Sequence, residues 1–129
     1  MKLFYSFTFL LFTVLSFSQD YTGKYLKKIN SVNGEIFEYS LNLNDDNSYS
    51  IKIYRNLNQK NSIDEFFVGN GKWKTENKKV LFFPDLSNEK NEIDLSNTTA
   101  RFDGKNKSAL VFFNSNISWN LNVGMQKIN

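Results

Sequence analysis

Apolar and polar residues alternate one by one over short stretches of this chain. Residues 37–43 and 49–53 follow this pattern, and a longer run places apolar side chains at Ile117, Trp119, Leu121, Val123 and Met125. Successive side chains of a strand point to opposite faces, so the alternation predicts β-strands with one apolar and one wet face. No stretch sustains a helical period. The chain is therefore predicted to be all-β.

Turn-forming residues separate the predicted strands. The runs at 37–43 and 49–53 are divided by Asn44, Asp45, Asp46 and Asn47. Asn and Asp tolerate turn dihedrals and hydrogen-bond their own backbone, so these two runs are expected to form a hairpin. Further strands are predicted at residues 24–29, 63–74, 79–83, 92–95, 99–102 and 108–113.

The order of these strands indicates the fold class. Short strands joined in sequence by tight turns predict an antiparallel meander, and a meander hides its edges best by closing into a small β-barrel. The alternative is a two-sheet β-sandwich. In a closed barrel the last strand, which contains Trp119, must pair with both residues 108–113 and the opening strand.

The N-terminus has the pattern of a secretory signal peptide at residues 1–18. Lys2 supplies a basic start, residues 3–17 form an apolar core, and Ser16 and Ser18 place small side chains before a cleavage site. Cleavage after Ser18 leaves a single domain at residues 19–129, either secreted or periplasmic. The alternative is a membrane anchor, but a spanning helix needs about 20 apolar residues and this run is shorter. No stable membrane span is expected after cleavage.

Composition excludes several kinds of chemistry. The chain contains no cysteine and no histidine, which excludes disulfides, thiolate metal sites, lipid attachment at a cysteine and the commonest general base. The carboxylates fall in predicted turns or on polar faces, so no catalytic residue, metal or cofactor is expected and the chain is predicted not to be an enzyme. Asp45 and Asp46 could hold a weak Ca²⁺, but their loop lacks the ligand spacing and closing Glu of a calcium-binding loop.

The charge pattern bears on partners. The formal net charge is +3, with lysines and carboxylates interleaved along the chain. Nucleic-acid binding requires basic side chains gathered on one face. No nucleic-acid partner is therefore expected.

Three side chains are candidates for contact with a ligand: Trp73, Arg101 and Trp119. Both tryptophans lie on predicted apolar faces, where core packing is the commoner role of an aromatic ring. Arg101 stands between Ala100 and Phe102. It either points into the barrel, to meet the anionic head of a ligand, or lies on the wet face, as strand alternation favours.

Phenylalanine occurs in adjacent pairs, namely Phe66 with Phe67, Phe82 with Phe83, and Phe112 with Phe113. Neighbours on a strand point to opposite faces, so one ring of each pair must face outward. If these strands lie close together, the outward rings form an apolar patch for a homodimer or another protein. The alternatives are bulges that turn both rings inward, or a loop packed over them.

Three local patterns carry a resemblance to a known group of proteins. Gly23-Lys24-Tyr25 opens the first strand, an acidic hairpin turn spans residues 41–49, and Gly71-Lys72-Trp73-Lys74 closes a central strand. In this order the patterns resemble small lipocalin-like proteins of bacterial envelopes, and they are similar to the N-terminal domain of the NlpE-type copper-resistance lipoproteins. The chain lacks the cysteines of that group, so thiol-based metal handling is not implied. The resemblance implies a small barrel and a binding or stress-sensing role.

Two classes of function remain at this point. The first is a non-catalytic binding module of the bacterial envelope, which holds a small apolar ligand in the barrel mouth or a protein on its outer phenylalanines. The second is a barrel filled by its own side chains that serves as a structural, inhibitor or adaptor protein without a small ligand. An eight-stranded barrel is only just wide enough for side chains to fill, so bulky inward residues favour the second.

Overall fold

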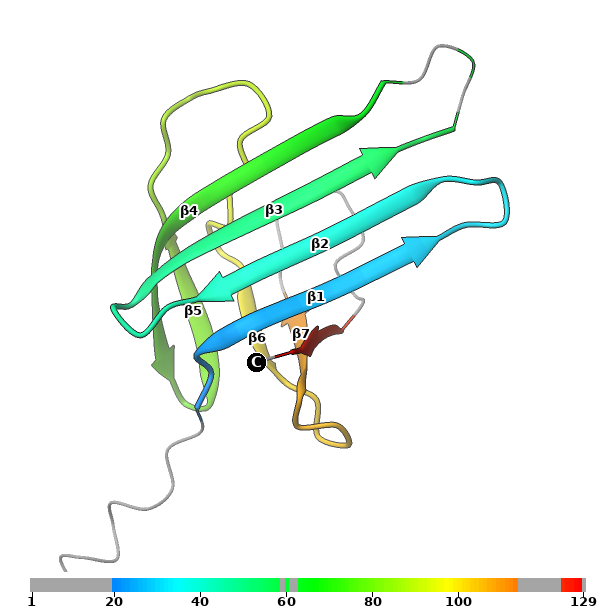
Figure 1. The fold of residues 1–129 in the computed structure, drawn as a ribbon. Helices are drawn as coiled ribbons and strands as arrows, with labels where there is room; N and C mark the ends of the chain where they lie inside the picture. The colour runs from blue at the N-terminus through cyan, green and yellow to red at the C-terminus, as the bar shows by residue number, and fades with distance from the viewer. Residues whose placement is uncertain (1–19, 59, 61–62, 114–123, 129) are drawn as a thin grey trace, which may run out of the picture.

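The computed structural model describes residues 20–58, 60, 63–113 and 124–128. Within these residues every regular element is a strand (Figure 1). The strands are β1 (Gly23–Asn30), β2 (Ile36–Leu43), β3 (Ser48–Asn56), β4 (Glu65–Glu76), β5 (Lys79–Pro84), β6 (Thr99–Phe102), β7 (Ala109–Phe113) and β8 (Met125–Lys127).

The strands form a closed barrel in chain order, and every neighbouring pair is antiparallel. The predicted meander barrel is therefore confirmed over the sandwich. Closure depends on β8, which pairs with β7 through Ala109 and Leu110 and with β1 through Tyr25 and Leu26. The remainder of the expected last strand, including Trp119, lies outside the described residues.

The β2–β3 hairpin forms as its turn residues predict. The Asn44 N–H donates to the Ser48 carbonyl at 2.9 Å, and Asn47 has a positive φ of 67°. The Asp46 carboxylate accepts from the Ser48 N–H at 2.9 Å and from its hydroxyl at 2.5 Å, which lowers the pKa of Asp46. Side-chain oxygens thus satisfy the turn and set the register in which Leu41 faces Ile51.

The prediction of a strand at residues 92–95 is wrong, although buried and exposed side chains alternate there as predicted. Ile93 and Leu95 are buried, but the segment makes only an isolated parallel bridge, between Val68 and Glu92. Pairing stops because the chain turns: Asp94 accepts from the Ser96 N–H at 2.8 Å, and the Thr98 N–H donates to the Leu95 carbonyl at 3.1 Å. Turn chemistry therefore overrides the strand pattern here.

The core lies inside the barrel on the predicted inward positions. The long strands β1–β4 form one broad wall, and β5–β7 form the opposite side (Figure 1). Inward residues of β1–β3 are fully or almost fully buried, and they are Tyr25, Tyr39, Leu41, Leu43, Tyr49, Ile51 and Ile53. Phe37, which begins the alternating run 37–43, faces inward but is only partly buried because it lies near the end of the barrel.

Candidate functional site

Trp73 on β4 closes one end of the barrel. Its side chain is buried, with 7% of its surface exposed. The indole Nε1 donates to the Asn44 carbonyl at 3.0 Å, and the backbone N–H donates to the Asn47 carbonyl at 2.8 Å. Both acceptors belong to the β2–β3 turn. The polar atom of Trp73 is therefore already bonded to protein, as in a core residue.

Aromatic rings from three strands cross the interior next to this end. Tyr49 of β3 meets Phe82 of β5 edge-on, with ring centroids 5.1 Å apart. Phe82 in turn stacks on Phe112 of β7, with centroids 5.9 Å apart. These strands are not neighbours in the barrel order, so the contacts bridge its interior. All three rings are buried, and at this level the barrel is occupied by its own side chains.

Burial decreases toward the opposite end of the barrel. A row of inward residues crosses β1–β4 there in direct register and consists of Ile29, Phe37, Arg55 and Glu65. Arg55 and Glu65 form an ion pair at 2.5 Å, and their side chains are 27% and 33% exposed. The Arg55 guanidinium also lies 5.4 Å from the centre of the Phe67 ring. This end combines apolar side chains with charge, and we call these five residues the open end.

Arg101 does not take the inward position that one alternative gave it. The side chain is exposed on β6, and its guanidinium lies 4.4 Å from the centre of the Phe113 ring. The inward cation is Arg55 instead. Sequence reasoning missed Arg55, although the alternation of Tyr49, Ile51 and Ile53 continues directly to it.

Each phenylalanine pair places one ring farther inside than the other. Phe82 and Phe112 are buried in the core, whereas Phe83 is 49% exposed and Phe113 is half-buried. In the pair on β4, Phe67 packs partly buried against the core and Phe66 is 63% exposed. Neighbouring rings on these strands therefore point to opposite faces of the barrel wall.

Two of the outward rings, Phe66 and Phe83, lie far apart on the barrel surface. Phe83 stands opposite Lys72 on β4, six residues away from Phe66 on that strand, and such a separation is about 20 Å along a strand. Phe66 instead packs near Tyr54, with ring centroids 5.2 Å apart. Phe66 and Phe83 therefore do not belong to one apolar patch.

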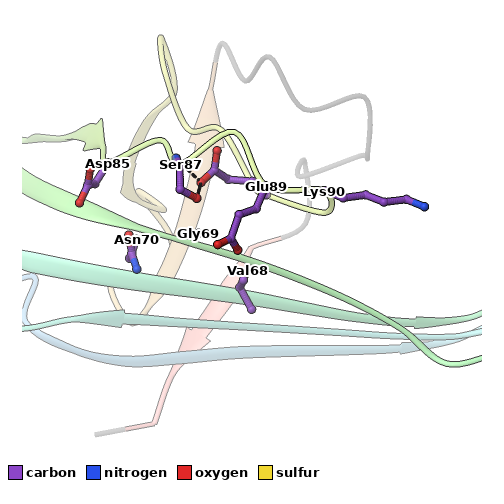
Figure 2. A pocket seen from close by; sticks show the side chains of 8 residues that line it. Val68, Gly69, Asn70, Asp85, Ser87, Glu89 and Lys90 are labelled. Atoms are coloured by element: carbon purple, nitrogen blue, oxygen red, sulfur yellow. Dashed lines mark hydrogen bonds between the residues drawn. The ribbon is translucent and has the colours of Figure 1, made fainter.

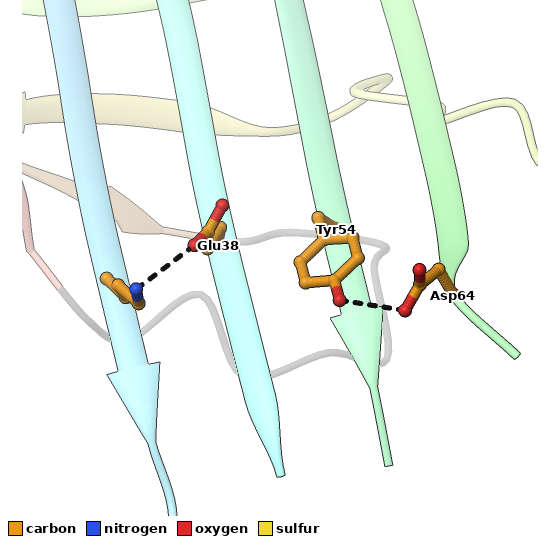
Figure 3. Close-up of polar contacts among 4 residues, drawn as sticks. Glu38, Tyr54 and Asp64 are labelled. Carbon is orange, nitrogen blue, oxygen red and sulfur yellow. Dashed lines mark hydrogen bonds and ion pairs between the residues drawn. The ribbon is translucent and has the colours of Figure 1, made fainter. Parts of the chain in front are cut away.

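A polar row crosses the outer face of β1–β3 (Figure 3), and its Tyr54 also makes the ring contact with Phe66. Lys28, Glu38 and Tyr54 lie in register on β1, β2 and β3. Lys28 and Glu38 form an exposed ion pair at 3.4 Å, and the Tyr54 hydroxyl donates to Asp64 at 2.8 Å. The bond to the Asp64 carboxylate raises the pKa of Tyr54. Aromatic and charged groups thus share this face.

A hollow of about 270 Å³ lies outside the barrel, between β4 and the segment that follows β5 (Figure 2). The Glu92 carboxylate organises that segment, because it accepts from the Ser87 N–H at 2.8 Å, the Ser87 hydroxyl at 2.7 Å and the Asn88 N–H at 3.3 Å. These bonds lower the pKa of Glu92. The hollow is lined by Val68, Gly69, Asn70, Asp85, Ser87, Glu89, Lys90 and Glu92.

In the part of the chain that the structure describes, no three His, Cys, Asp or Glu residues gather as a metal site would require. Asp46 of the candidate Ca²⁺ loop is already engaged by Ser48. No helix among the described residues is long and apolar enough to cross a membrane.

Comparisons of the chain with models of protein families, with curated proteins and with solved structures found no match.

Proposed function

We propose that the chain is an exported, non-catalytic protein of the bacterial envelope that acts as an adaptor or inhibitor by binding another protein on its outer surface. The observation that carries this proposal is the aromatic contact from Tyr49 through Phe82 to Phe112 across the interior. A barrel of this size has room for its own side chains or for one small ligand. The aromatic rings that bridge the interior support a barrel filled by its own side chains.

Export and the absence of catalysis are supported by the sequence. The signal-peptide pattern at residues 1–18 and the resemblance to lipocalin-like envelope proteins support an envelope location. The lack of His and Cys removes the usual general bases and thiol nucleophiles.

The outer face of β3 and β4 is the best candidate for partner contact. Phe66 is 63% exposed there and its ring lies tilted against the ring of Tyr54, while the exposed Ile63 and Val68 add apolar surface. Asp64 provides a carboxylate within the same group. Aromatic anchors with adjacent polar groups are typical of protein interfaces.

The open end favours a second candidate function, which is binding of a small apolar ligand with an anionic head. Arg55 faces inward beside the Phe67 ring, and its side chain is 27% exposed. A ligand carboxylate would compete with Glu65 for the guanidinium. Ile29 and Phe37 would contact the apolar part of the ligand.

Native mass spectrometry of the protein purified from the exported fraction, with titration by a fluorescent fatty-acid analogue, separates the two candidates. We expect only masses that the polypeptide itself accounts for, with no retained small molecule, and no saturable binding of the analogue. Saturable one-to-one binding that Arg55→Gln weakens and Arg101→Gln leaves intact would overturn the filled-barrel proposal in favour of the second candidate. Arg101 is the matched control because it is exposed and also lies over a phenylalanine ring.

Partner contact is tested by a photo-reactive phenylalanine analogue placed at position 66 in cells. We expect a discrete adduct whose added mass is not that of a second copy of the chain. The same analogue at position 112, which is buried, is the control and should give no intermolecular adduct. Absence of any adduct at position 66, or an adduct with a second copy alone, contradicts the proposed partner surface.

A further inference from the structure

The outward positions of β4–β7 carry a concentration of positive charge. From Lys72 onward these positions hold four cations and one carboxylate, Glu76. We call the four cations the basic wall, and they are Lys72, Lys74, Lys79 and Arg101. All four are exposed.

Apolar rings lie among these cations. The Lys74 ammonium is 5.4 Å from the centre of the Phe83 ring, and the Arg101 guanidinium is 4.4 Å from that of Phe113. Cations over ring faces are held in place by the ring quadrupole. The wall therefore suits a partner that presents carboxylates and accepts an apolar contact through the half-exposed Phe83.

The segment at residues 85–94 has the opposite charge. It holds the carboxylates of Asp85, Glu89, Glu92 and Asp94 and one cation, Lys90. Hydrogen bonds fix this acidic segment to the edge of β4: the Asp85 N–H donates to the Asn70 carbonyl at 2.9 Å and the Ile93 N–H to the Val68 carbonyl at 2.8 Å.

The basic wall and the acidic segment are neighbours on the same outer face. Val68 and Asn70 are outward residues of β4 that line the hollow beneath the acidic segment (Figure 2). Lys72, the next outward residue of β4, begins the basic wall and lies about 7 Å farther along the strand. Two adjacent patches of opposite charge become self-complementary when a two-fold axis passes between them.

We propose that this face docks a second copy of the chain, so that the acidic segment of each copy lies on the basic wall of the other. The charges support this occupant, because four cations with one carboxylate meet four carboxylates with one cation. An anionic membrane would attract the wall but repel the adjacent acidic segment. The hollow of about 270 Å³ offers space for a lysine side chain of the other copy beside Asp85 and Glu89.

Paired charge reversals test this arrangement by analytical ultracentrifugation of the mature chain at low salt. One variant carries Lys72→Glu and Lys74→Glu, and the other carries Asp85→Lys and Glu89→Lys. Each alone should weaken the dimer about tenfold or more, because like charges then face each other. A mixture of the two variants should regain the dimer, because each altered patch then meets its opposite.

A control variant with Lys24→Glu and Lys28→Glu has the same charge change as the first variant, on the outer face of β1. It should remain dimeric, and circular dichroism should show all variants folded. A parent chain that stays monomeric, reversed variants that dimerise like the parent, or a mixture that fails to associate would each overturn the proposal.

An independent readout uses the photo-reactive analogue at position 83. We expect an adduct of twice the mass of the mature chain, and its loss at high salt because surface charges are then screened. No such adduct at low salt contradicts the docking face. These tests involve neither the ligand titration nor the adduct at position 66, so this inference and the proposed function can fail separately.

Discussion

Two buried tyrosines of the core, Tyr25 on β1 and Tyr49 on β3, differ in how their hydroxyl groups are satisfied. The Tyr25 hydroxyl donates to the Tyr21 carbonyl at 2.6 Å. The Tyr49 hydroxyl, by contrast, is buried and has no hydrogen-bond partner among the described residues. Burial of an unbonded hydroxyl opposes folding, because the group loses its bonds to water. Both side chains fill space, but only one of the two hydroxyl groups contributes a bond.

Tyr49→Phe is expected to stabilise the domain by about 1 kcal/mol, because it removes a buried hydroxyl without removing a bond. Tyr25→Phe is the matched control and should destabilise by about 1 kcal/mol, since it leaves the Tyr21 carbonyl without its donor. Urea unfolding followed by circular dichroism measures both changes. Equal destabilisation by the two substitutions would show that the Tyr49 hydroxyl is bonded in the folded protein.

At the scale of elements, the segment between β5 and β6 completes the barrel where β5 does not reach. β5 pairs with the C-terminal half of β4, from Gly71 to Glu76. The N-terminal half of β4 is instead bonded at Val68 to residues 91 and 93 of the segment. Ile93 packs over the backbone of Gly69, where an added Cβ would lie 2.6 Å from the Ile93 carbonyl oxygen. The absence of a side chain at Gly69 is what admits the segment.

Gly69→Ala is therefore expected to destabilise the domain by about 1–3 kcal/mol, the usual range for an overpacked core. Gly104→Ala is the control, because a Cβ there would meet nothing within 4 Å, and surface changes of this kind are worth only about 0.5 kcal/mol or less. Thermal melting of both variants measures the difference. Similar melting temperatures for the two would mean that the segment does not lie closely on β4.

The whole molecule is an aromatic-rich barrel whose stability should depend on alkaline pH. Burial raises the pKa of both Tyr25 and Tyr49 above the usual value for a phenol. A tyrosine in the unfolded chain ionises at about pH 10. Above that pH the unfolded chain therefore releases the hydroxyl protons of Tyr25 and Tyr49 more readily than the folded protein does. The contribution of these two neutral tyrosines to the stability of the fold is fully present below about pH 10. It is lost as pH rises toward their pKa values in the folded protein.

Each of these tyrosines should lower the free energy of unfolding by about 1.4 kcal/mol per pH unit above about pH 10. Urea unfolding at a series of alkaline pH values measures this slope. The absorbance of the phenolate shows at which pH the tyrosines ionise in the folded and in the unfolded protein. Tyr49→Phe should reduce this slope by the contribution of one tyrosine. A slope that this variant leaves unchanged would assign the pH dependence to other groups, such as the lysines.

More of the fold than of the candidate site could be predicted from the sequence. Alternation along 37–43 and 49–53 specified both strands, and the Asn44–Asn47 cluster specified their turn, because each signal is local. Arg55 was missed because its inward position depends on where β3 ends. Strand alternation favoured an outward Arg101 and one outward ring in each phenylalanine pair, but neighbouring strands decide what these outward side chains meet.

Local pattern alone therefore determined that this protein is all-β, where the β2–β3 turn lies, and which face of its strands is apolar, because strand geometry repeats every two residues. Tertiary structure decided the rest. Closure of the barrel brought Tyr49, Phe82 and Phe112 together from separate strands, and it set the acidic segment beside the basic wall on β4. These contacts join residues far apart in the chain, and their formation depends on register and closure, which no short stretch of sequence encodes.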